Sequence, residues 1–159
     1  MTKYRVIKDT REKRGWYFRA DGECLGYIEH KLNTGDYSVE GYEDKISIER
    51  KGSIDEFANN VKQPRFFREL ERLNKIEHAY LVLEFGMFDL LKYPETSKLN
   101  PKQKALLRIN AGYLFKQLMK IYNDYPNIKI VFCGGKIHAF LFTQKLFESI
   151  INATSRDSR

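Results

Sequence analysis

The stretch of sequence that decides the fold reads Gly35-Asp36-Tyr37 and then, thirteen residues after the aspartate, Glu49-Arg50-Lys51. Successive side chains of a β-strand point to opposite faces, so Glu49 and Lys51 are expected on one face. Ile46 and Ile48 then lie on the opposite face, where their apolar side chains can meet a core. The sequence therefore predicts a strand with an acid and a lysine on its polar side.

The aspartate joins this polar face if the chain turns back between the two motifs. A hairpin with residues 40–44 as its connection would bring Asp36 next to Glu49. Two carboxylates suit Mg²⁺, which usually keeps several waters and needs only one or two protein carboxylates. Phosphodiester hydrolysis also needs an oriented water and neutralised phosphate charge, which Lys51 can supply. Arg50 points to the other face, where we expect it to brace the site or to reach a phosphate around the strand edge.

A second acidic motif, Asp9-Thr10-Arg11-Glu12, follows the strand-like residues 4–8. Together with Gly35-Asp36-Tyr37 and with Glu49-Arg50-Lys51 followed by Asp55, it resembles the XPF-type nuclease domain of the restriction-endonuclease-like superfamily. The pattern of that family reads D-x-R-E, then G-D-Y, then E-R-K-x-x-x-D, and the chain has each element in the same order. The resemblance implies an α/β fold with a restriction-endonuclease-like mixed central sheet flanked by helices.

The resemblance also implies the roles of individual side chains. Asp36 and Glu49 would hold the divalent metal, Mg²⁺, for which Mn²⁺ can substitute, and Lys51 would serve the water or the phosphate. The remaining catalytic candidates are Asp9, Glu12, Arg50 and Asp55. Asp55 leaves an alternative open, because residues 53–56 have the spacing of a capping box and an acid there can simply stabilise the start of a helix.

Basic residues near these motifs are candidates for binding DNA. Arg65 lies where the family usually has an arginine followed four residues later by glutamine, but Glu69 stands at that later position. Arg68 is on a neighbouring stripe of the same expected helix. Beside the first acidic motif, Trp16 and Tyr17 could stack on bases while nearby cations follow the strand, although a core needs aromatic residues equally. The cations of this second group are Arg11, Lys13 and Arg14.

Composition is consistent with one domain over residues 1–151, followed by a polar and frayed tail over residues 152–159. The net charge of +7 and the pI near 9.3 favour a polyanionic partner, but the charge can also serve solubility alone. Cys24 and Cys133 lack metal-ligand spacing, which favours a reduced, cytoplasmic setting over a disulfide framework. No apolar run approaches the length of a membrane span, so no membrane partner is expected.

Further elements follow from periodicity and turn residues. Asp21-Gly22 predicts a hairpin between strands over residues 16–18 and 24–28. Helices are expected to begin at Ser53 and Pro64, and a buried strand to follow. The remaining expectations are a strand over 79–85, a loop over 86–100, a helix over 101–122, a strand over 128–133 and a helix over 137–151.

The predicted function is a metal-dependent DNA endonuclease that acts at branched, flap or single-strand-containing DNA in repair or recombination. The alternative is a catalytically inactive DNA-binding or dimer-partner module on the same fold. The short chain is most similar to the stand-alone versions of phages and mobile elements, and no small-molecule cofactor is expected. We also expect a homodimer with the last helix and the strand over 128–133 nearest the two-fold axis, because Phe142 cannot face the same sheet as Phe140 and Phe147.

Overall fold

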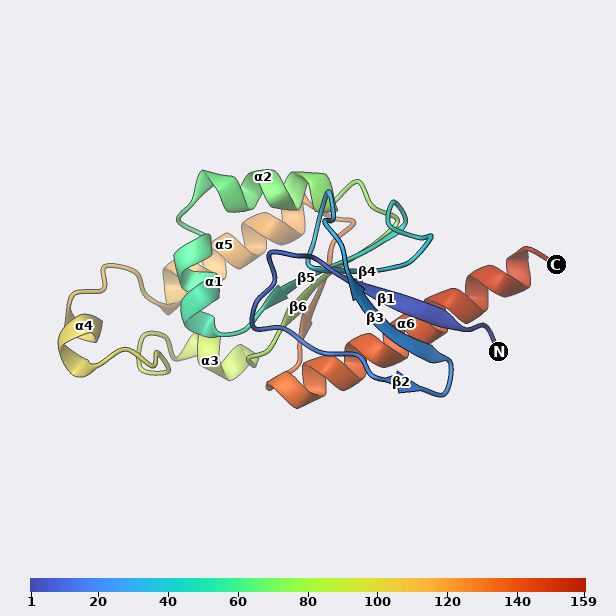
Figure 1. Ribbon diagram of the computed structural model, residues 1–159. Helices are drawn as coiled ribbons and strands as arrows, with labels where there is room; N and C mark the ends of the chain where they lie inside the picture. The colour runs from blue at the N-terminus through green and yellow to red at the C-terminus, as the bar shows by residue number, and fades with distance from the viewer.

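A seven-stranded mixed sheet runs through the computed structural model, which describes residues 1–159 (Figure 1). Its strand order is β2-β3-β1-β4-β5-β6-β7. The strands are β1 (Tyr4–Lys8), β2 (Ala20–Asp21), β3 (Cys24–Glu29), β4 (Tyr37–Val39), β5 (Ile46–Lys51), β6 (His78–Leu83) and β7 (Lys129–Phe132). Strand β4 is antiparallel to both β1 and β5, whereas β5, β6 and β7 are parallel to one another. The predicted mixed sheet flanked by helices is therefore confirmed.

The structure has six helices, which are α1 (Ile54–Asn60), α2 (Pro64–Leu73), α3 (Met87–Leu91), α4 (Pro101–Ala105), α5 (Ala111–Asp124) and α6 (Lys136–Asp157). All but α4 pack against the sheet. Helices α1, α2, α3 and α5 pack with β6 in one apolar cluster, and α6 packs with β1, β4 and β5 in the other (Figure 1). The sheet is thus the middle layer between a group of helices and one long helix. No helix is long and apolar enough to cross a membrane.

The two sides of β5 have opposite chemistry, as the sequence predicts. Ile46 and Ile48 are fully buried in the cluster that α6 covers. Glu49 and Lys51 lie on the side of α1 and α2. The predicted hairpin is also present, since β4 and β5 are antiparallel and Tyr37 is paired with Ile48. The connection between them, residues 40–45, is one residue longer than the predicted turn.

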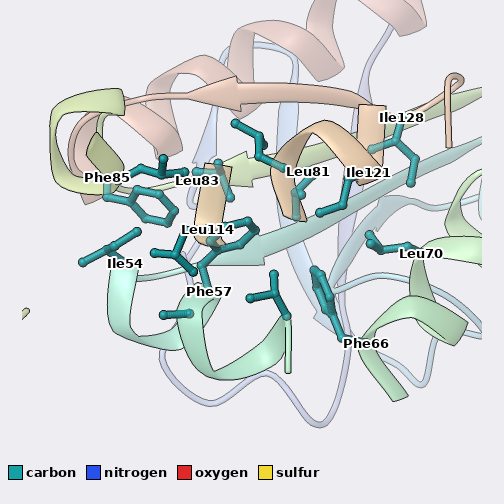
Figure 2. Packing of buried hydrophobic residues seen from close by; sticks show 14 of the residues in the cluster. Ile54, Phe57, Phe66, Leu70, Leu81, Leu83, Phe85, Leu114, Ile121 and Ile128 are labelled. Atoms are coloured by element: carbon teal, nitrogen blue, oxygen red, sulfur yellow. The ribbon is translucent and has the colours of Figure 1, made fainter. Parts of the chain in front are cut away.

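Aromatic residues of α1, α2 and the end of β6 form the centre of the cluster on the polar side of β5 (Figure 2). Phe57 is completely buried, and its ring meets Phe66 and Phe85 at centroid distances of 6.5 and 5.8 Å. Leu81 and Leu83 of β6 complete this layer. Because α1 and α2 are fixed against the sheet here, their polar sides form walls above the neighbouring part of β5.

The predicted hairpin around Asp21-Gly22 is much shorter than expected. The antiparallel partner of β3 in the hairpin is the two-residue strand β2 alone, and residues 16–18 form no strand. The Tyr37 hydroxyl accepts a hydrogen bond from the Trp16 N–H at 2.6 Å and donates one to its carbonyl oxygen at 3.4 Å. These contacts occupy the backbone groups that a strand partner would need, while Trp16 and Phe18 are buried as core residues.

Two predictions for the middle of the chain are wrong in detail. The expected loop over 86–100 contains α3, whose start is stabilised by the Asp89 carboxylate accepting the Gly86 N–H at 2.9 Å. The expected helix over 101–122 is divided into α4 and α5. The division follows from Asn110, which is extended and whose side chain accepts the Tyr113 N–H at 3.0 Å, so a new helix begins there.

Helix α6 extends beyond the expected end at residue 151 and continues to Asp157. Its final turns are held by the amino terminus, because the Thr2 N–H donates to Asn152 and the Thr2 hydroxyl to Ser155. Phe147 is buried on the sheet, whereas Phe142 is 37% exposed. One of the phenylalanines therefore faces outward, as predicted.

Gly35 has a positive φ and lies close to β5, so a larger residue is expected to destabilise the fold at this position. Its φ is 76°, and a Cβ there would lie 2.1 Å from Ser47 Oγ and 3.0 Å from the Ile48 carbonyl oxygen. We expect Gly35→Ala to lower the free energy of unfolding by about 2–4 kcal/mol, because it adds a steric conflict to left-handed strain. Urea denaturation measures the loss.

The matched control is Gly41→Ala. Gly41 has a φ of 85° but nothing within 4 Å of its Cβ position, so it reports the backbone strain alone, about 1 kcal/mol. Equal losses in the two variants would show that the close approach of residue 35 to β5 contributes nothing.

Candidate active site

A cavity of about 350 Å³ lies where the polar side of β5 faces the walls formed by α1 and α2. Only one of its lining residues, Phe66, is apolar. The lining brings together most of the side chains predicted from the three motifs, namely Asp9, Arg11, Glu12, Asp36, Glu49, Arg50 and Lys51. Segments far apart in the sequence thus meet at one polar hollow.

Asp36 and Glu49 meet because of the β4–β5 register. The Asp36 N–H donates to the Ile48 carbonyl oxygen at 2.7 Å, and the Asp36 carboxylate accepts the backbone N–H of Arg50 at 2.8 Å. Burial raises the pKa of both carboxyl groups, and the charge of Glu49 raises the pKa of Asp36 further. Ionisation of both carboxyl groups is therefore unfavourable in the folded protein without a bound cation.

Lys51 lies beside this pair. Its ammonium is 3.2 Å from Glu49 Oε1 and 4.0 Å from Glu56 Oε1, and it lies 4.9 Å from the centre of the Phe66 ring. Burial acts to lower the pKa of Lys51, but Glu49, Glu56 and Asp36 outweigh burial and raise the pKa. The lysine is consequently a fixed positive charge in the cavity.

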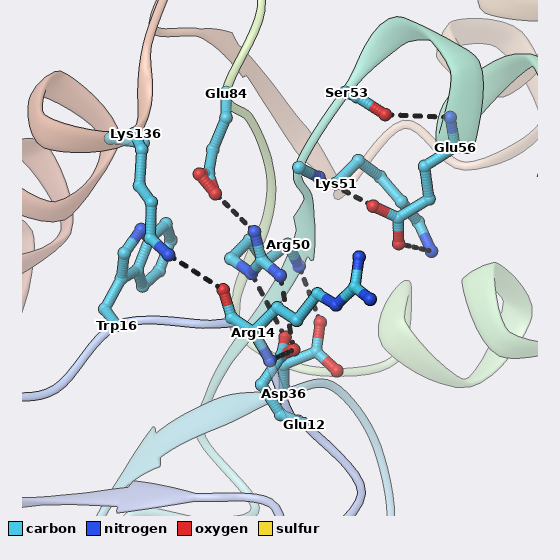
Figure 3. A network of polar contacts seen from close by, with 12 residues as sticks. Glu12, Arg14, Trp16, Asp36, Arg50, Lys51, Ser53, Glu56, Glu84 and Lys136 are labelled. Carbon is cyan, nitrogen blue, oxygen red and sulfur yellow. Dashed lines mark hydrogen bonds and ion pairs between the residues drawn. The ribbon is translucent and has the colours of Figure 1, made fainter. Parts of the chain in front are cut away.

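Arg50 occupies the other side of β5 and joins two acids (Figure 3). Its guanidinium binds Glu12 through Nε at 3.2 Å and through Nη2 at 3.3 Å, and Nη1 donates to Glu84. Although burial opposes the charge, the two acids raise the pKa of Arg50, so it stays protonated. Of the two predicted roles, the structure supports bracing, because the guanidinium links the segment after β1 to the end of β6.

Asp9 lines the cavity but is already occupied by protein donors. Its carboxylate accepts hydrogen bonds from Arg11 Nε at 2.8 Å and from the Leu32 N–H at 2.7 Å. Burial acts to raise the pKa of Asp9, but the bonds from Arg11 and Leu32 outweigh it and lower the pKa. Asp9 therefore anchors the residues around the site and has little capacity left for a ligand.

Asp55 is the one predicted catalytic residue that the structure separates from the others. It does not line the cavity, and its carboxylate accepts hydrogen bonds from the Ser97 hydroxyl and the Lys98 N–H. It lies in the first turn of α1, where the Ser53 side chain accepts the Glu56 N–H at 3.1 Å. This position agrees with the helix-start alternative, and Asp55 in addition holds the loop after α3.

The donor set of the cavity fits a hard divalent cation. Asp9 is paired with Arg11 and Glu12 with Arg50, whereas Asp36 has no ion pair. The positive charge of Lys51 acts on both Asp36 and Glu49 and favours the ionised form of each. No group of three or more His, Cys, Asp or Glu side chains gathers as a complete metal site. Two carboxylates are nevertheless sufficient for Mg²⁺, which keeps water in its remaining positions.

Comparison with protein-family models matches residues 8–146 to the ERCC4 domain. The chain belongs to the ERCC4 domain family. Two similar solved structures are XPF from Aeropyrum pernix, with a TM-score of 0.58 and 19% identity, and the same protein in complex with DNA, with 0.59 and 20%. They match 89% and 98% of this chain, which spans 63% and 66% of theirs. A search of curated proteins found no match.

These matches confirm the predicted fold, since the sheet and its helices correspond to those of an XPF nuclease. They give no support to an origin in phages or mobile elements. The matched region of the ERCC4 domain includes all three motifs and continues through the first half of α6.

The residues expected to bind DNA are only partly gathered at the ERCC4 cavity. Arg11 and Arg65 line it, and Arg65 pairs with Glu69 at 3.1 Å, the position where the family usually has glutamine. Lys13 and Arg14 are exposed outside the cavity, and Lys13 donates to the Thr10 carbonyl oxygen. The fifth residue, Arg68, lies on another side of α2.

Several residues in or beside the cavity were given no role there by the sequence motifs. Glu84, which follows β6 and does not line the cavity, is buried against Arg50. Glu56 was noted only as a capping residue, yet it also approaches Lys51. The further lining residues of α1, the following turn and α2 are Asn60, Gln63, Glu69 and Arg72. Their helical spacing is the only signal that could have identified them.

Two aspartates of the ERCC4 site should respond to the same substitution with opposite sign. Because the folded-state pKa of Asp36 is raised, its ionised form destabilises the metal-free fold above the unfolded pKa of about 3.9. The lowered pKa of Asp9 means that its ionised form stabilises the fold over the same range. We expect Asp36→Asn to raise the melting temperature at pH 7, and Asp9→Asn to lower it.

Thermal unfolding in EDTA from pH 4 to pH 8 measures both effects. The difference in melting temperature between each variant and wild type should shrink as the pH falls. Wild-type Asp36 becomes protonated, and the ionised form of Asp9 contributes less stability as the unfolded chain takes up its proton. A loss of stability in Asp36→Asn at pH 7 would contradict the electrostatic account of the pair.

Proposed function

We propose that the chain is a metal-dependent endodeoxyribonuclease that hydrolyses phosphodiester bonds in DNA. The observation that carries the proposal is the pair Asp36 and Glu49, two buried carboxylates with raised pKa values beside Lys51 in a polar cavity. Membership of the ERCC4 family supports it, because members are mostly nucleases that generally use a divalent metal. The net charge of +7 is suited to a polyanionic substrate.

Each group of the cavity has a role in this reaction. Asp36 and Glu49 would hold Mg²⁺, or Mn²⁺ in its place, and such an ion would supply neutralisation of phosphate charge and a water of lowered pKa. Lys51 holds the attacking water or a phosphate oxygen. Arg50 keeps β5 and Glu12 in place from behind, and Arg65 at the rim is available to a neighbouring phosphate.

The proposed substrate is branched, flap or single-strand-containing DNA, as arises in repair or recombination. A cavity of about 350 Å³ is of the size that receives a small ligand, so it can take a nucleotide of a separated strand more readily than a duplex. The solved complex of XPF from Aeropyrum pernix with DNA supports DNA as the partner.

The carboxylates are tested by Asp36→Asn and Glu49→Gln, which remove charge but keep shape. We expect cleavage to fall by at least about a hundredfold while DNA binding is retained, because metal binding and charge neutralisation are lost. Nicking of supercoiled plasmid with Mg²⁺, with Mn²⁺ and with EDTA measures it. Wild-type protein that binds DNA but never nicks would favour the alternative, an inactive DNA-binding or dimer-partner module.

The same assay separates Lys51 from the metal ligands. Lys51→Ala should lower turnover even at saturating metal, whereas calorimetry should still detect Mn²⁺ binding, because the carboxylates remain. Unchanged turnover would show that Lys51 is only the counter-ion of Glu49 and Glu56.

Dimerisation is proposed on a separate observation. Ile137, Leu141 and Phe142 expose 73, 49 and 37% of their surface along the outer side of α6. Strand β7 beside it is the edge of the sheet, so its outer backbone groups have no strand partner. A two-fold contact would bury both features in the same patch of each subunit.

Light scattering at low micromolar concentration tests the dimer, for which we expect twice the chain mass of 18.8 kDa. The double variant Leu141→Ser and Phe142→Ser should shift the mass to that of the monomer. Leu106→Ser is the control, because this residue is 81% exposed at the end of α4. A wild-type mass near 18.8 kDa would exclude the dimer.

A further inference from the structure

A second hollow, of about 420 Å³, lies between α2 and α5, outside the ERCC4 cavity. Its cations are Lys62, Arg68 and Lys120, and its one acid is Glu71. All three cations are exposed, and none forms an ion pair in the structure. Arg50 and Arg65 of the reaction cavity, by contrast, are each paired with an acid. The hollow therefore presents positive charge that is free to meet an anion.

Aromatic side chains contribute to the same hollow. Phe67 and Tyr125 line it and are only partly buried. Lys120 Nζ lies 4.6 Å from the centre of the Phe67 ring, and the Tyr125 hydroxyl donates to the Phe67 carbonyl oxygen at 3.3 Å. The tyrosine is thus held by its hydroxyl end. Uncommitted cations next to aromatic rings are the features with which proteins bind the backbone and bases of single strands.

The position of Gln63 connects this hollow to the reaction cavity. Gln63 lines both, and it precedes α2 without capping a helix N–H by its side chain. The two hollows therefore meet at the turn between α1 and α2. A strand that leaves the cavity across this turn arrives directly among the free cations. A base can stack on Tyr125 only when it is unpaired, so this ring favours a single strand over intact duplex.

We propose that the hollow between α2 and α5 is a subsite for single-stranded DNA, continuous with the reaction cavity. Lys62, Arg68 and Lys120 bind phosphates, and Tyr125 provides a stacking surface for a base. The proposal rests on the proposed function for the path of the strand out of the reaction cavity. Binding of the strand in the hollow, however, does not require cleavage. Helix α2 then contacts DNA on two of its sides, because Arg65 lines the reaction cavity and Arg68 lines the hollow between α2 and α5.

The charge component is tested in Asp36→Asn protein without metal, so that no cleavage occurs. Fluorescence anisotropy with a labelled oligothymidine measures affinity over a range of salt concentrations. The triple variant Lys62→Ala, Arg68→Ala and Lys120→Ala should reduce the slope of log affinity against log salt by about 2, since each phosphate contact of a single strand contributes about 0.7. Binding of a matched duplex should change much less.

The matched control removes the same charge from exposed lysines outside both hollows, in the triple variant Lys75→Ala, Lys92→Ala and Lys116→Ala. Equal slopes in the two triple variants would overturn the subsite. An equal loss of duplex and single-strand binding would also overturn it, because the hollow would then contribute only general positive charge.

The stacking component is tested at Tyr125. Tyr125→Leu should weaken oligothymidine binding about tenfold, which corresponds to the usual contribution of one stacked base, while Tyr125→Phe keeps most of the affinity. An abasic oligonucleotide has nothing to stack, so its affinity should be the same for wild type and Tyr125→Leu. Equal weakening of both probes would assign Tyr125 a structural role and contradict the proposal.

Failure of the proposed function gives a different pattern. Wild-type protein that never nicks plasmid, with the hollow variants still selectively weak on oligothymidine, would overturn the nuclease and leave the subsite. Normal nicking with hollow variants that match the lysine control would overturn the subsite and leave the nuclease.

Discussion

The hydrogen bond from the Arg50 N–H to the Asp36 carboxylate, 2.8 Å long, is the contact on which the site depends. It joins the two motifs directly, because a backbone donor of β5 holds a side chain that precedes β4. The same strand presents Ile48 to the core and Glu49 to the cavity. A shift of register by one residue would exchange these faces, so the burial of the isoleucines also fixes the position of the carboxylates.

The two sides of β5 handle buried charge in opposite ways. Behind the strand, Arg50 is matched by Glu12 and Glu84, and removal of one member of such a buried pair is costly because the other loses its compensation. In front of it, Asp36 and Glu49 repel one another and share Lys51. The matched network makes this part of the cavity wall rigid, and the unmatched pair leaves an affinity for a cation.

The sequence was sufficient for the β4–β5 hairpin, the faces of β5 and the meeting of three motifs, because these follow from a period of two and from local turns. The sequence was insufficient where a side chain far away in the sequence determines the local structure. Tyr37 takes the backbone groups of Trp16, which prevents the longer hairpin, and Thr2 stabilises the last turns of α6. Asp55 has the spacing of a catalytic residue in the family pattern, but its hydrogen-bond partner Ser97 lies in a loop with no recognisable pattern.

The outer face of α6 is structurally connected to the candidate active site. Lys136, the first residue of the helix, donates to the Arg14 carbonyl oxygen at 3.0 Å, and the Arg14 N–H donates to Glu12 at 3.4 Å (Figure 3). Glu12 in turn holds Arg50. Ile137 therefore lies one residue from a chain of polar contacts that ends on β5. A subunit bound at this apolar face would restrain the start of α6, and with it the segment that positions Glu12 against Arg50.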